Sequence, residues 1–397
     1  MNYGKQLWII LPLITIHIGF AGTLGVLHEY KTESNLIDVL VSINSTSVVP
    51  ETYIYTDHFQ NSKSPESAIA IYPPQKVVVS KNNKLLGIFQ AEDRPETPGE
   101  PYNFAFSLYS SDTRLLYSLQ DKAARELRQP SYFINDKQQA VVQVSANGDR
   151  LKFFDNHGSF LREKQLSQNV PHNYELPEIQ FSEACDCMIF LTRMFNSESG
   201  KMIPLLYMLS LIGEELWQYQ PILDRVEAIS VSKSGKYIAI SGATYKPLVF
   251  QAHYQTFIFD TSGTIRTSVP YRAHYLLFDP NEQNLLLANE QTIRIVNLKN
   301  GGVSMIKSLS SGQHEIADIC FLNDSSFAVS SGTIKYINGL PVYDNPEIQV
   351  ICLDGQSTAH YLFKNEYSFR GKLLPSLTGE QIGIALKSRF VVLHFHS

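Results

Sequence analysis

The sequence lacks the short motifs that mark the common catalytic and nucleotide-binding families. It contains no Gly-x-Ser-x-Gly, His-Glu-x-x-His, Walker A or Gly-x-Gly-x-x-Gly motif, so no catalytic residue can be assigned from a signature. Lys and Arg (33) do not exceed Asp and Glu (38), and this balance does not predict a nucleic-acid partner. Charged residues make up 18% and hydrophobic residues 44% of the chain, which excludes a disordered chain and a polytopic membrane protein.

Cysteine is scarce as well, with four residues in a chain of 397. Cys185 and Cys187 are two positions apart at the edge of a predicted strand, where such residues lie roughly 6.5–7 Å apart, at the far limit for a disulfide. A lone Cys-x-Cys is also not the paired Cys-x-x-Cys pattern of a structural zinc site. We interpret all four cysteines as small apolar residues, keep a disulfide at Cys185 or Cys187 as the alternative, and predict no metal.

Charge is absent between Leu7 and Leu27, directly after Lys5. A run of this length can cross a bilayer as a helix, which needs about 20 residues. The basic start, the apolar core and the small residues Gly19 and Ala21 equally match a secretory signal cleaved after Ala21. We therefore expect residues 1–27 to be a signal peptide or a membrane anchor, with cleavage slightly favoured. Either one predicts that the rest of the chain is exported, to a periplasmic or extracellular location.

The body of the chain repeats itself. Seven times a short apolar strand runs into a polar turn and then a second apolar strand, and successive units are 44 to 55 residues apart. A period near 50 residues is typical of four-stranded propeller blades. The residues that end the first strand of each unit are Val79, Ile134, Phe181, Val231, Phe278, Leu322 and Leu377.

Each unit contains two hairpins with recognisable turns. The clearest first hairpin is Ala228–Ile240, which turns at Ser-Lys-Ser-Gly, and a clear second hairpin is Thr256–Gly263, which turns at Asp-Thr-Ser-Gly. Ser, Asn, Asp and Gly suit tight turns because they accept positive φ or bond their own backbone. Two hairpins make four strands, here named a to d. A β-sandwich or two barrels would also show short, evenly spaced strands, but seven such units favour a propeller.

These hairpins resemble those of the WD40-like and quinoprotein-like β-propeller superfamily over residues 65 to 397. The resemblance implies an all-β fold of seven four-stranded blades in residues 66–397, after a linker at 28–65. The Trp-Asp signature of WD40 repeats is absent, and Gly213–Trp217 looks like a quinoprotein blade motif but occurs once, so no cofactor is expected. The last unit ends before strand d. We expect an N-terminal segment to complete it, with Ala68–Tyr72 favoured over Thr52–Tyr55.

Candidate binding residues lie in long inserts between strands b and c. Tyrosines lie in or at the edges of three inserts, Gln90–Asn103, Gly242–Gln255 and Ile337–Pro346, and aromatic-rich loops on a rigid scaffold commonly form recognition surfaces. Two histidines at the start of strand a could approach the central channel. The alternatives are loops that pack on each other and histidines that are merely half-buried. The candidates are Tyr102, Tyr245, Tyr254, Tyr336, Tyr343, His274 and His314.

The sequence thus favours an exported propeller that binds a protein or small-molecule ligand through its loop face without catalysis. An extracytoplasmic propeller enzyme of the lyase, hydrolase or quinoprotein type, with its site at the central channel, is the alternative. A structural subunit of an envelope complex is a third possibility, and it would show an apolar patch on an outer strand. Contact with a membrane is expected only through the N-terminal segment, if that segment is not cleaved.

Overall fold

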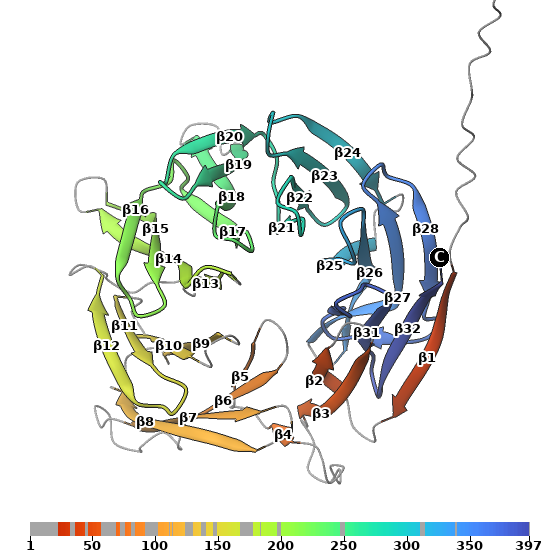
Figure 1. Cartoon of the computed structure of the whole chain (residues 1–397), viewed down its shortest axis with the longest axis horizontal. Helices are drawn as coiled ribbons and strands as arrows, with labels where there is room; N and C mark the ends of the chain where they lie inside the picture. The colour runs from red at the N-terminus through yellow and green to blue at the C-terminus, as the bar shows by residue number, and fades with distance from the viewer. Residues whose placement is uncertain are drawn as a thin grey trace, which may run out of the picture.

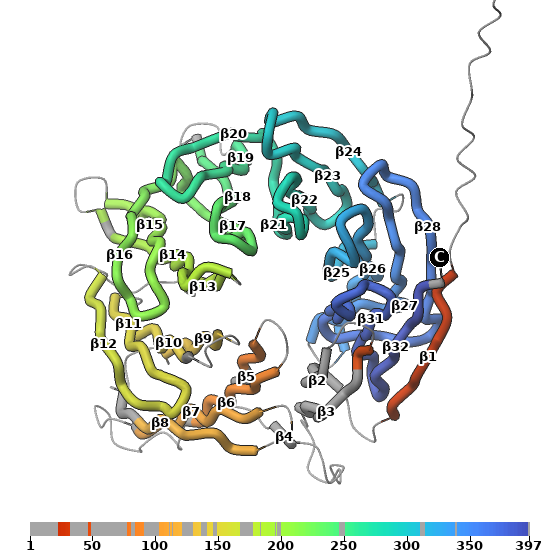
Figure 2. Tube along the Cα trace, viewed as in Figure 1, coloured from red at the N-terminus to blue at the C-terminus, as the bar shows by residue number. Residues whose placement is uncertain are grey.

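The computed structural model describes residues 23–31, 36–43, 47–56, 69–71, 76–80, 84–91, 102–110, 112, 114–123, 130–135, 140–145, 149–166, 178–182, 184–196, 200–246, 251–309, 314–337 and 340–396. The described secondary structure consists of β-strands, which are arranged in a ring (Figure 1, Figure 2). Within these residues no helix has the length and apolar character that crossing a membrane requires.

Six blades follow the repeat in chain order, each with antiparallel strands ordered a, b, c, d. Blades 1 to 3 contain β5 (Lys76–Val79), β6 (Leu85–Ala91), β7 (Tyr102–Ser110), β8 (Leu115–Ala123); β9 (Ser131–Asn135), β10 (Ala140–Val144), β11 (Arg150–Phe154), β12 (Phe160–Gln165); and β13 (Glu178–Phe181), β14 (Cys187–Asn196), β15 (Lys201–Ser210), β16 (Glu215–Tyr219).

Blades 4 to 6 contain β17 (Arg225–Val231), β18 (Tyr237–Lys246), β19 (Gln251–Asp260), β20 (Ile265–Val269); β21 (Tyr275–Phe278), β22 (Asn284–Ala288), β23 (Thr292–Asn297), β24 (Val303–Ser308); and β25 (His314–Phe321), β26 (Ser326–Ile337), β27 (Leu340–Cys352), β28 (Ser357–Leu362). A short extra strand, β29 (Tyr367–Ser368), pairs with β27. In Figure 1 the a strands lie nearest the centre of the ring and the d strands on its rim.

The predicted turn chemistry is confirmed. At the end of strand a, buried Ser80, Ser232 and Ser376 accept a backbone N–H from the residue five positions later, at 3.0 to 3.1 Å. In the second hairpin, Asp155 and Asp260 accept two backbone N–H groups each, as expected for turn-forming aspartates. These side chains satisfy turn amides that strand pairing leaves unbonded, so the repeat in the sequence is a repeat of turn closures.

The hydrophobic core lies between neighbouring blades. One cluster joins Ala239 and Ile258 of blade 4 to Leu285 and Leu287 of blade 5, and comparable clusters join the other neighbours described. Each fully buried leucine or isoleucine contributes roughly 1.5–3 kcal/mol relative to exposure. A blade is therefore stable through the packing of both of its faces, and the ring depends on being closed.

The strand that closes the ring is not the one expected from the sequence. Blade 7 contains β30 (Leu373–Pro375), β31 (Gln381–Ala385) and β32 (Arg389–His396), and its fourth strand is β1 (Thr23–Lys31). β1 pairs antiparallel with β32 from Thr23↔His396 to Lys31↔Arg389, and Arg389 also forms an ion pair with Glu29 at 2.8 Å. The expectation of Ala68–Tyr72 is wrong because Ile69–Ile71 pairs elsewhere.

An eighth sheet stands beside the seven blades. β2 (Leu36–Ile43) and β3 (Val48–Thr56) form an antiparallel pair, and β4 (Ile69–Ile71) joins β3 in parallel. Val48 is buried against Phe390 and Val392 of blade 7, and its N–H donates to Gln381 Oε1 at 2.9 Å. Figure 1 shows this sheet between blade 7 and blade 1. The expected linker at 28–65 therefore contributes strands. The described residues form six four-stranded blades, blade 6 with four strands and the added β29, and one three-stranded sheet.

The expected b–c loops are largely strands. β18 and β19 pair without interruption from Tyr237↔Asp260 to Lys246↔Gln251, and β26 and β27 continue to Ile337↔Leu340. In blade 5, by contrast, β22 has only five residues, against ten in β18 and twelve in β26. At about 3.3 Å per residue, the hairpins of blades 4 and 6 extend roughly 15–25 Å further than the b–c turn of blade 5 between them.

The cysteine prediction is also corrected. Cys185 and Cys187 form a disulfide, with their Cα atoms 5.4 Å apart. The spacing is shorter than the strand estimate because Cys185 lies in the bend before β14 and only Cys187 belongs to the strand. The disulfide packs against Gly235 in the first turn of blade 4, where no side chain occupies the space. Cys320 and Cys352 are free thiols.

Candidate functional site

The two long hairpins carry matching pairs of tyrosines. In blade 4, Tyr245 lies opposite Ala252, and Tyr254 is two residues further along the partner strand. In blade 6, Tyr336 lies opposite Pro341, and Tyr343 is again two residues further along. Residues in this diagonal relation lie on the same side of a hairpin. Each hairpin thus presents one tyrosine near its tip and one nearer the ring.

The outer and inner tyrosines differ in exposure. Tyr245 is 42% and Tyr336 is 74% exposed, which is high for aromatic side chains on a strand. Tyr254 and Tyr343 are half-buried and are held by neighbouring side chains. The Arg272 guanidinium lies over the Tyr254 ring at 5.0 Å, in the range of a cation–π contact.

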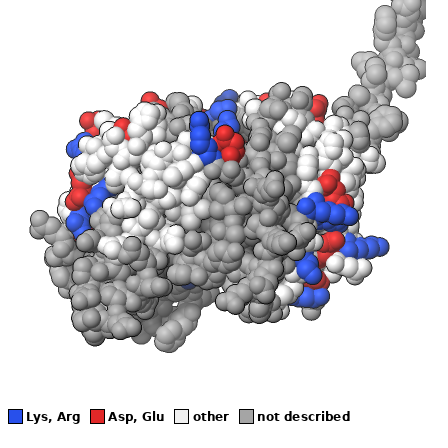
Figure 3. All heavy atoms as spheres, turned by 90° about the horizontal axis from the view of Figure 1, so that it is seen from below, with Lys and Arg blue, Asp and Glu red and all other residues white. Residues whose placement is uncertain are grey.

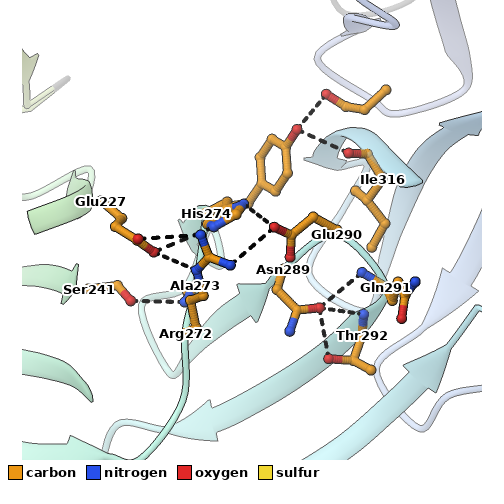
Figure 4. A network of polar contacts seen from close by, with 12 residues as sticks. Glu227, Ser241, Arg272, Ala273, His274, Asn289, Glu290, Gln291, Thr292 and Ile316 are labelled. Atoms are coloured by element: carbon orange, nitrogen blue, oxygen red, sulfur yellow. Dashed lines mark hydrogen bonds and ion pairs between the residues drawn. The ribbon is translucent and has the colours of Figure 1, made fainter. Parts of the chain in front are cut away.

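A charged cluster lies at the base of the blade 4 hairpin. Arg272 donates to both oxygens of Glu227, at 2.7 and 3.3 Å, and to Glu290 at 3.4 Å. The ring nitrogens of His274 face the same two carboxylates, at 3.5 Å from Glu227 and 3.4 Å from Glu290. Figure 4 shows Arg272 and His274 side by side between the two glutamates. The hydrogen bonds that Arg272 donates to Glu227 raise the pKa of Arg272 further, so its charge is fixed at any physiological pH.

Local structure explains why these side chains meet. Glu227 is on β17, and Arg272 and His274 lie in the connection that leads into β21. The Ala273 N–H between them donates to Ser241 Oγ at 2.9 Å, which fixes the connection. Asn289 Oδ1 accepts two turn amides and the Thr292 hydroxyl, and this shapes the short turn that presents Glu290 (Figure 4). In an antiparallel blade the d–a connection and the b–c turn lie at the same end of the strands, so all four side chains share one face.

The Tyr275 side chain connects the charged cluster to blade 6. The Tyr275 hydroxyl donates to the carbonyls of Ala317 at 2.8 Å and Ile316 at 3.2 Å, and it also contacts Tyr343. Burial and the nearby carboxylates raise the pKa of Tyr275 above its ordinary range, so it remains a neutral donor. The Ile316 N–H donates to the Glu290 carbonyl at 2.8 Å, which joins the turn of blade 5 to the first strand of blade 6.

Asp318 lies on β25, close enough to Tyr343 to affect it electrostatically. Its carboxylate accepts the N–H of Ile319 at 2.9 Å and the N–H of Leu373, in blade 7, at 2.7 Å. Burial nevertheless raises the pKa of Asp318 to about 6, because the cost of desolvating the carboxylate exceeds the gain from these bonds. Asp318 therefore links blades 6 and 7 through a group that titrates near neutral pH.

The structure brings together three of the seven predicted residues. Tyr254 and His274 meet through Arg272, and Tyr343 joins them through Tyr275. Tyr245 and Tyr336 are exposed near the hairpin tips, His314 is half-buried at the start of β25, and Tyr102 begins β7 with its side chain outside the described part.

Sequence reasoning missed Glu227, Arg272 and Glu290. The sequence does contain a signal for Glu227. It lies four residues before Val231, the residue that ends strand a of its unit, and His274 and Asp318 hold the same position before Phe278 and Leu322 in the next two units. No comparable signal identifies Arg272, which lies in a connection, or Glu290, which lies in a turn.

The chemistry of the cluster is that of a rigid polar framework. Arg272 occupies the space between the two carboxylates, and no group of three or more His, Cys, Asp or Glu side chains in the described part of the chain is arranged to hold a metal. On the side of the molecule in Figure 3, described basic and acidic side chains are interspersed in small groups. Nearer the hairpin tips, the side chains of Tyr245 and Tyr336 are exposed.

Comparison with known proteins supports the fold. No protein-family model and no curated protein matches the chain. The C-terminal WD40 domain of Sif2 matches 95% of this chain and 99% of that chain, with 10% identity and a TM-score of 0.53. A chain of the mitotic checkpoint complex matches at 9% identity, over 100% and 99% of the two chains, with a TM-score of 0.47. Sqt1 of Chaetomium thermophilum, bound to the N-terminus of ribosomal protein L10, matches at 10% identity, over 79% and 94%, with a TM-score of 0.44. The fold is a WD40-like β-propeller, as the repeat predicts.

Proposed function

We propose that this chain is an exported, non-catalytic scaffold that binds a protein partner through the hairpins of blades 4 and 6. The observation that carries the proposal is the exposure of Tyr245 and Tyr336 near the tips of two long antiparallel hairpins on one face. Tyrosine offers a large contact area with a polar tip at little cost in conformational entropy, and it is enriched at the energetic centres of interfaces.

The framework below supports this proposal. Two-stranded hairpins are only marginally stable by themselves, so a binding surface built on them needs support at the base. Arg272 supplies it for blade 4 by stacking on Tyr254 and pairing with Glu227 and Glu290. In blade 6, β29 pairs with β27 at Tyr343↔Ser368. Both inner tyrosines are thereby fixed, and the outer tyrosines are held in place for a partner.

Site-specific photo-crosslinking in the native host tests the protein-binding part. A photoreactive phenylalanine analogue at position 336 or 245 should yield a discrete crosslinked protein. The matched control is Leu377, which is 75% exposed in the a–b turn of blade 7, at the opposite end of the strands. We expect crosslinking at 336 and 245 and none at 377. Equal yields at all three positions, or none at 336 and 245, would contradict the proposal.

Export rests on the N-terminal sequence, and β1 supports cleavage over anchoring. Because Thr23–Leu27 of the uncharged run belong to β1, the sequence leaves Leu7–Gly22 for a membrane span. As a helix this segment would measure about 24 Å, short of the roughly 30 Å hydrocarbon core. Cleavage after Ala21 would leave β1 complete. The intact mass of the protein from its host should correspond to a chain that begins at Gly22, and a mass that includes residues 1–21 would refute cleavage.

A further inference from the structure

The strand that closes the ring begins almost directly after the predicted cleavage site. Cleavage after Ala21 leaves Gly22 as the first residue, and the next residue, Thr23, is already paired with His396. Leu24 follows, and it is 7% exposed and packs in the core cluster that joins blades 6 and 7. The second and third residues after the cut bond are therefore part of the folded ring.

β1 is held in blade 7 along its length. It pairs with β32 from its first residue, Thr23, to its last, Lys31, with one shift in register. Glu29 of β1 forms an ion pair with Arg389 of β32 at 2.8 Å. Releasing the start of β1 therefore breaks ladder hydrogen bonds and also removes Leu24 from the core.

This arrangement controls access to the bond that is cut. A protease holds the residues on both sides of the cut bond in an extended, unpaired form, so a bond beside a paired strand is cut only when the strand opens. A cleft that takes three residues after the cut must separate Thr23 from β32 and Leu24 from its core cluster. The closed ring thus protects the bond between Ala21 and Gly22.

The partner of β1 lies at the other end of the sequence. His396 follows Thr23 by 373 residues (396 − 23), and in the described part of the chain β1 pairs with no strand other than β32. Synthesis at about 5–20 residues per second separates the two strands by roughly 20–75 s. Throughout that interval β32 is not available to β1, and the bond beside β1 is accessible.

We infer that β1 fixes the order of maturation: the chain crosses the membrane unfolded, is cut after Ala21, and only then closes its ring. This inference rests on the export and cleavage proposed above, and it adds their order relative to folding. In the cut, water adds its hydroxyl to the Ala21 carbonyl carbon and a proton to the Gly22 nitrogen. A chain that closes its ring before the cut retains its signal.

The test compares three uncut full-length chains in detergent micelles as substrates of the host's signal peptidase. The first is the folded wild type. The second contains a flexible Gly-Ser linker of about ten residues between Gly22 and Thr23, which moves the cut bond away from the ring and leaves β1 unchanged. Its melting temperature should equal that of the wild type.

The third chain carries Leu393→Asp on the partner strand. Leu393 is fully buried in the same cluster as Leu24 and lies opposite Val26. A charge at this position should release β1 from blade 7, because a buried charge without a partner is strongly unfavourable. It changes no residue near the cut bond, so the protease meets the same recognition sequence as in the wild type.

We expect the folded wild type to be cut about 100-fold more slowly than either variant, because the cut requires β1 to open and Leu24 to leave the core. Equal rates for the wild type and the linker variant would overturn the inference and leave export and cleavage intact. A Leu393→Asp chain that is cut as slowly as the wild type would show that β1 does not protect the bond. If no chain is cut after Ala21, the proposed cleavage is refuted together with the inference.

Discussion

Replacing Leu24 with aspartate should lower the free energy of unfolding by about 3–5 kcal/mol, the range for a large core side chain lost and a charge buried in its place. Leu24 is only 7% exposed, and it packs in the cluster that joins blade 7 to blade 6, with Ile348, Val391 and Leu393. It belongs to β1, the strand that completes blade 7. The ring has no other strand at that place in the described chain, so the loss should reach the whole fold.

Leu27 provides the matched control. It lies three residues further along β1 and is 42% exposed, so Leu27→Asp should change the free energy of unfolding by no more than about 0.5 kcal/mol. Urea unfolding followed by tryptophan fluorescence measures both variants. If Leu24→Asp proved as stable as Leu27→Asp, β1 would not be part of the cooperative unit, and the ring would have to be closed in another way.

The closing strand shows where sequence reading failed. The seven units were predictable because each repeats the same turn chemistry, and buried Ser80, Ser232 and Ser376 perform the same closure in three of them. β1 contains no such turn. Its first residues belong to an uncharged run that also has the composition of a signal, and its pairing with β32 spans nearly the whole chain. A contact of that separation leaves no local pattern.

The hairpin of blade 6 was misread for a different reason. The segment Ile337–Pro346 contains Asn338-Gly339 between apolar residues, which is a strong local signal for a tight β-hairpin. The prediction of an insert follows from the length of the segment and ignores this turn signal. The aromatic character of the tyrosines predicts only a recognition role. Their actual arrangement, one exposed and one anchored on each hairpin, follows from a pairing register that the sequence states only through that turn.

The charged cluster could be predicted in part. His274 was singled out from its position at the start of strand a, and the equivalent positions of its neighbouring units would have added Glu227 and Asp318. Arg272 and Glu290 could not be found in this way, because they lie in connections whose paths are set by tertiary bonds such as Ala273 N–H to Ser241 Oγ. The repeat predicts only residues at positions that all units share, and Arg272 and Glu290 are not at such positions.

Asp318 gives the second large expected effect, a dependence of stability on pH. Burial raises the pKa of Asp318 from its ordinary value of 3.8 to about 6 in the folded chain. Between these values the folded chain holds a proton that the unfolded chain has released, so stability falls as pH rises. This stabilisation is fully present below about pH 4 and is lost as pH passes through 6. For this half-buried carboxyl, a pKa shift of this size changes the free energy of unfolding by about 2–3 kcal/mol.

The variant Asp318→Asn isolates this contribution, because its side chain does not titrate. The difference in free energy of unfolding, variant minus wild type, should rise by about 2–3 kcal/mol between pH 4 and pH 7.5. The control is Asp260→Asn in the second turn of blade 4, where hydrogen bonds from Ser262 and Thr264 lower the pKa of Asp260, so its difference should not rise. A flat difference for Asp318 would mean that its carboxylate is better solvated than its contacts indicate. Because Asp318 holds Leu373 at the start of blade 7, a confirmed rise would identify the junction of blades 6 and 7 as a pH-dependent part of the fold.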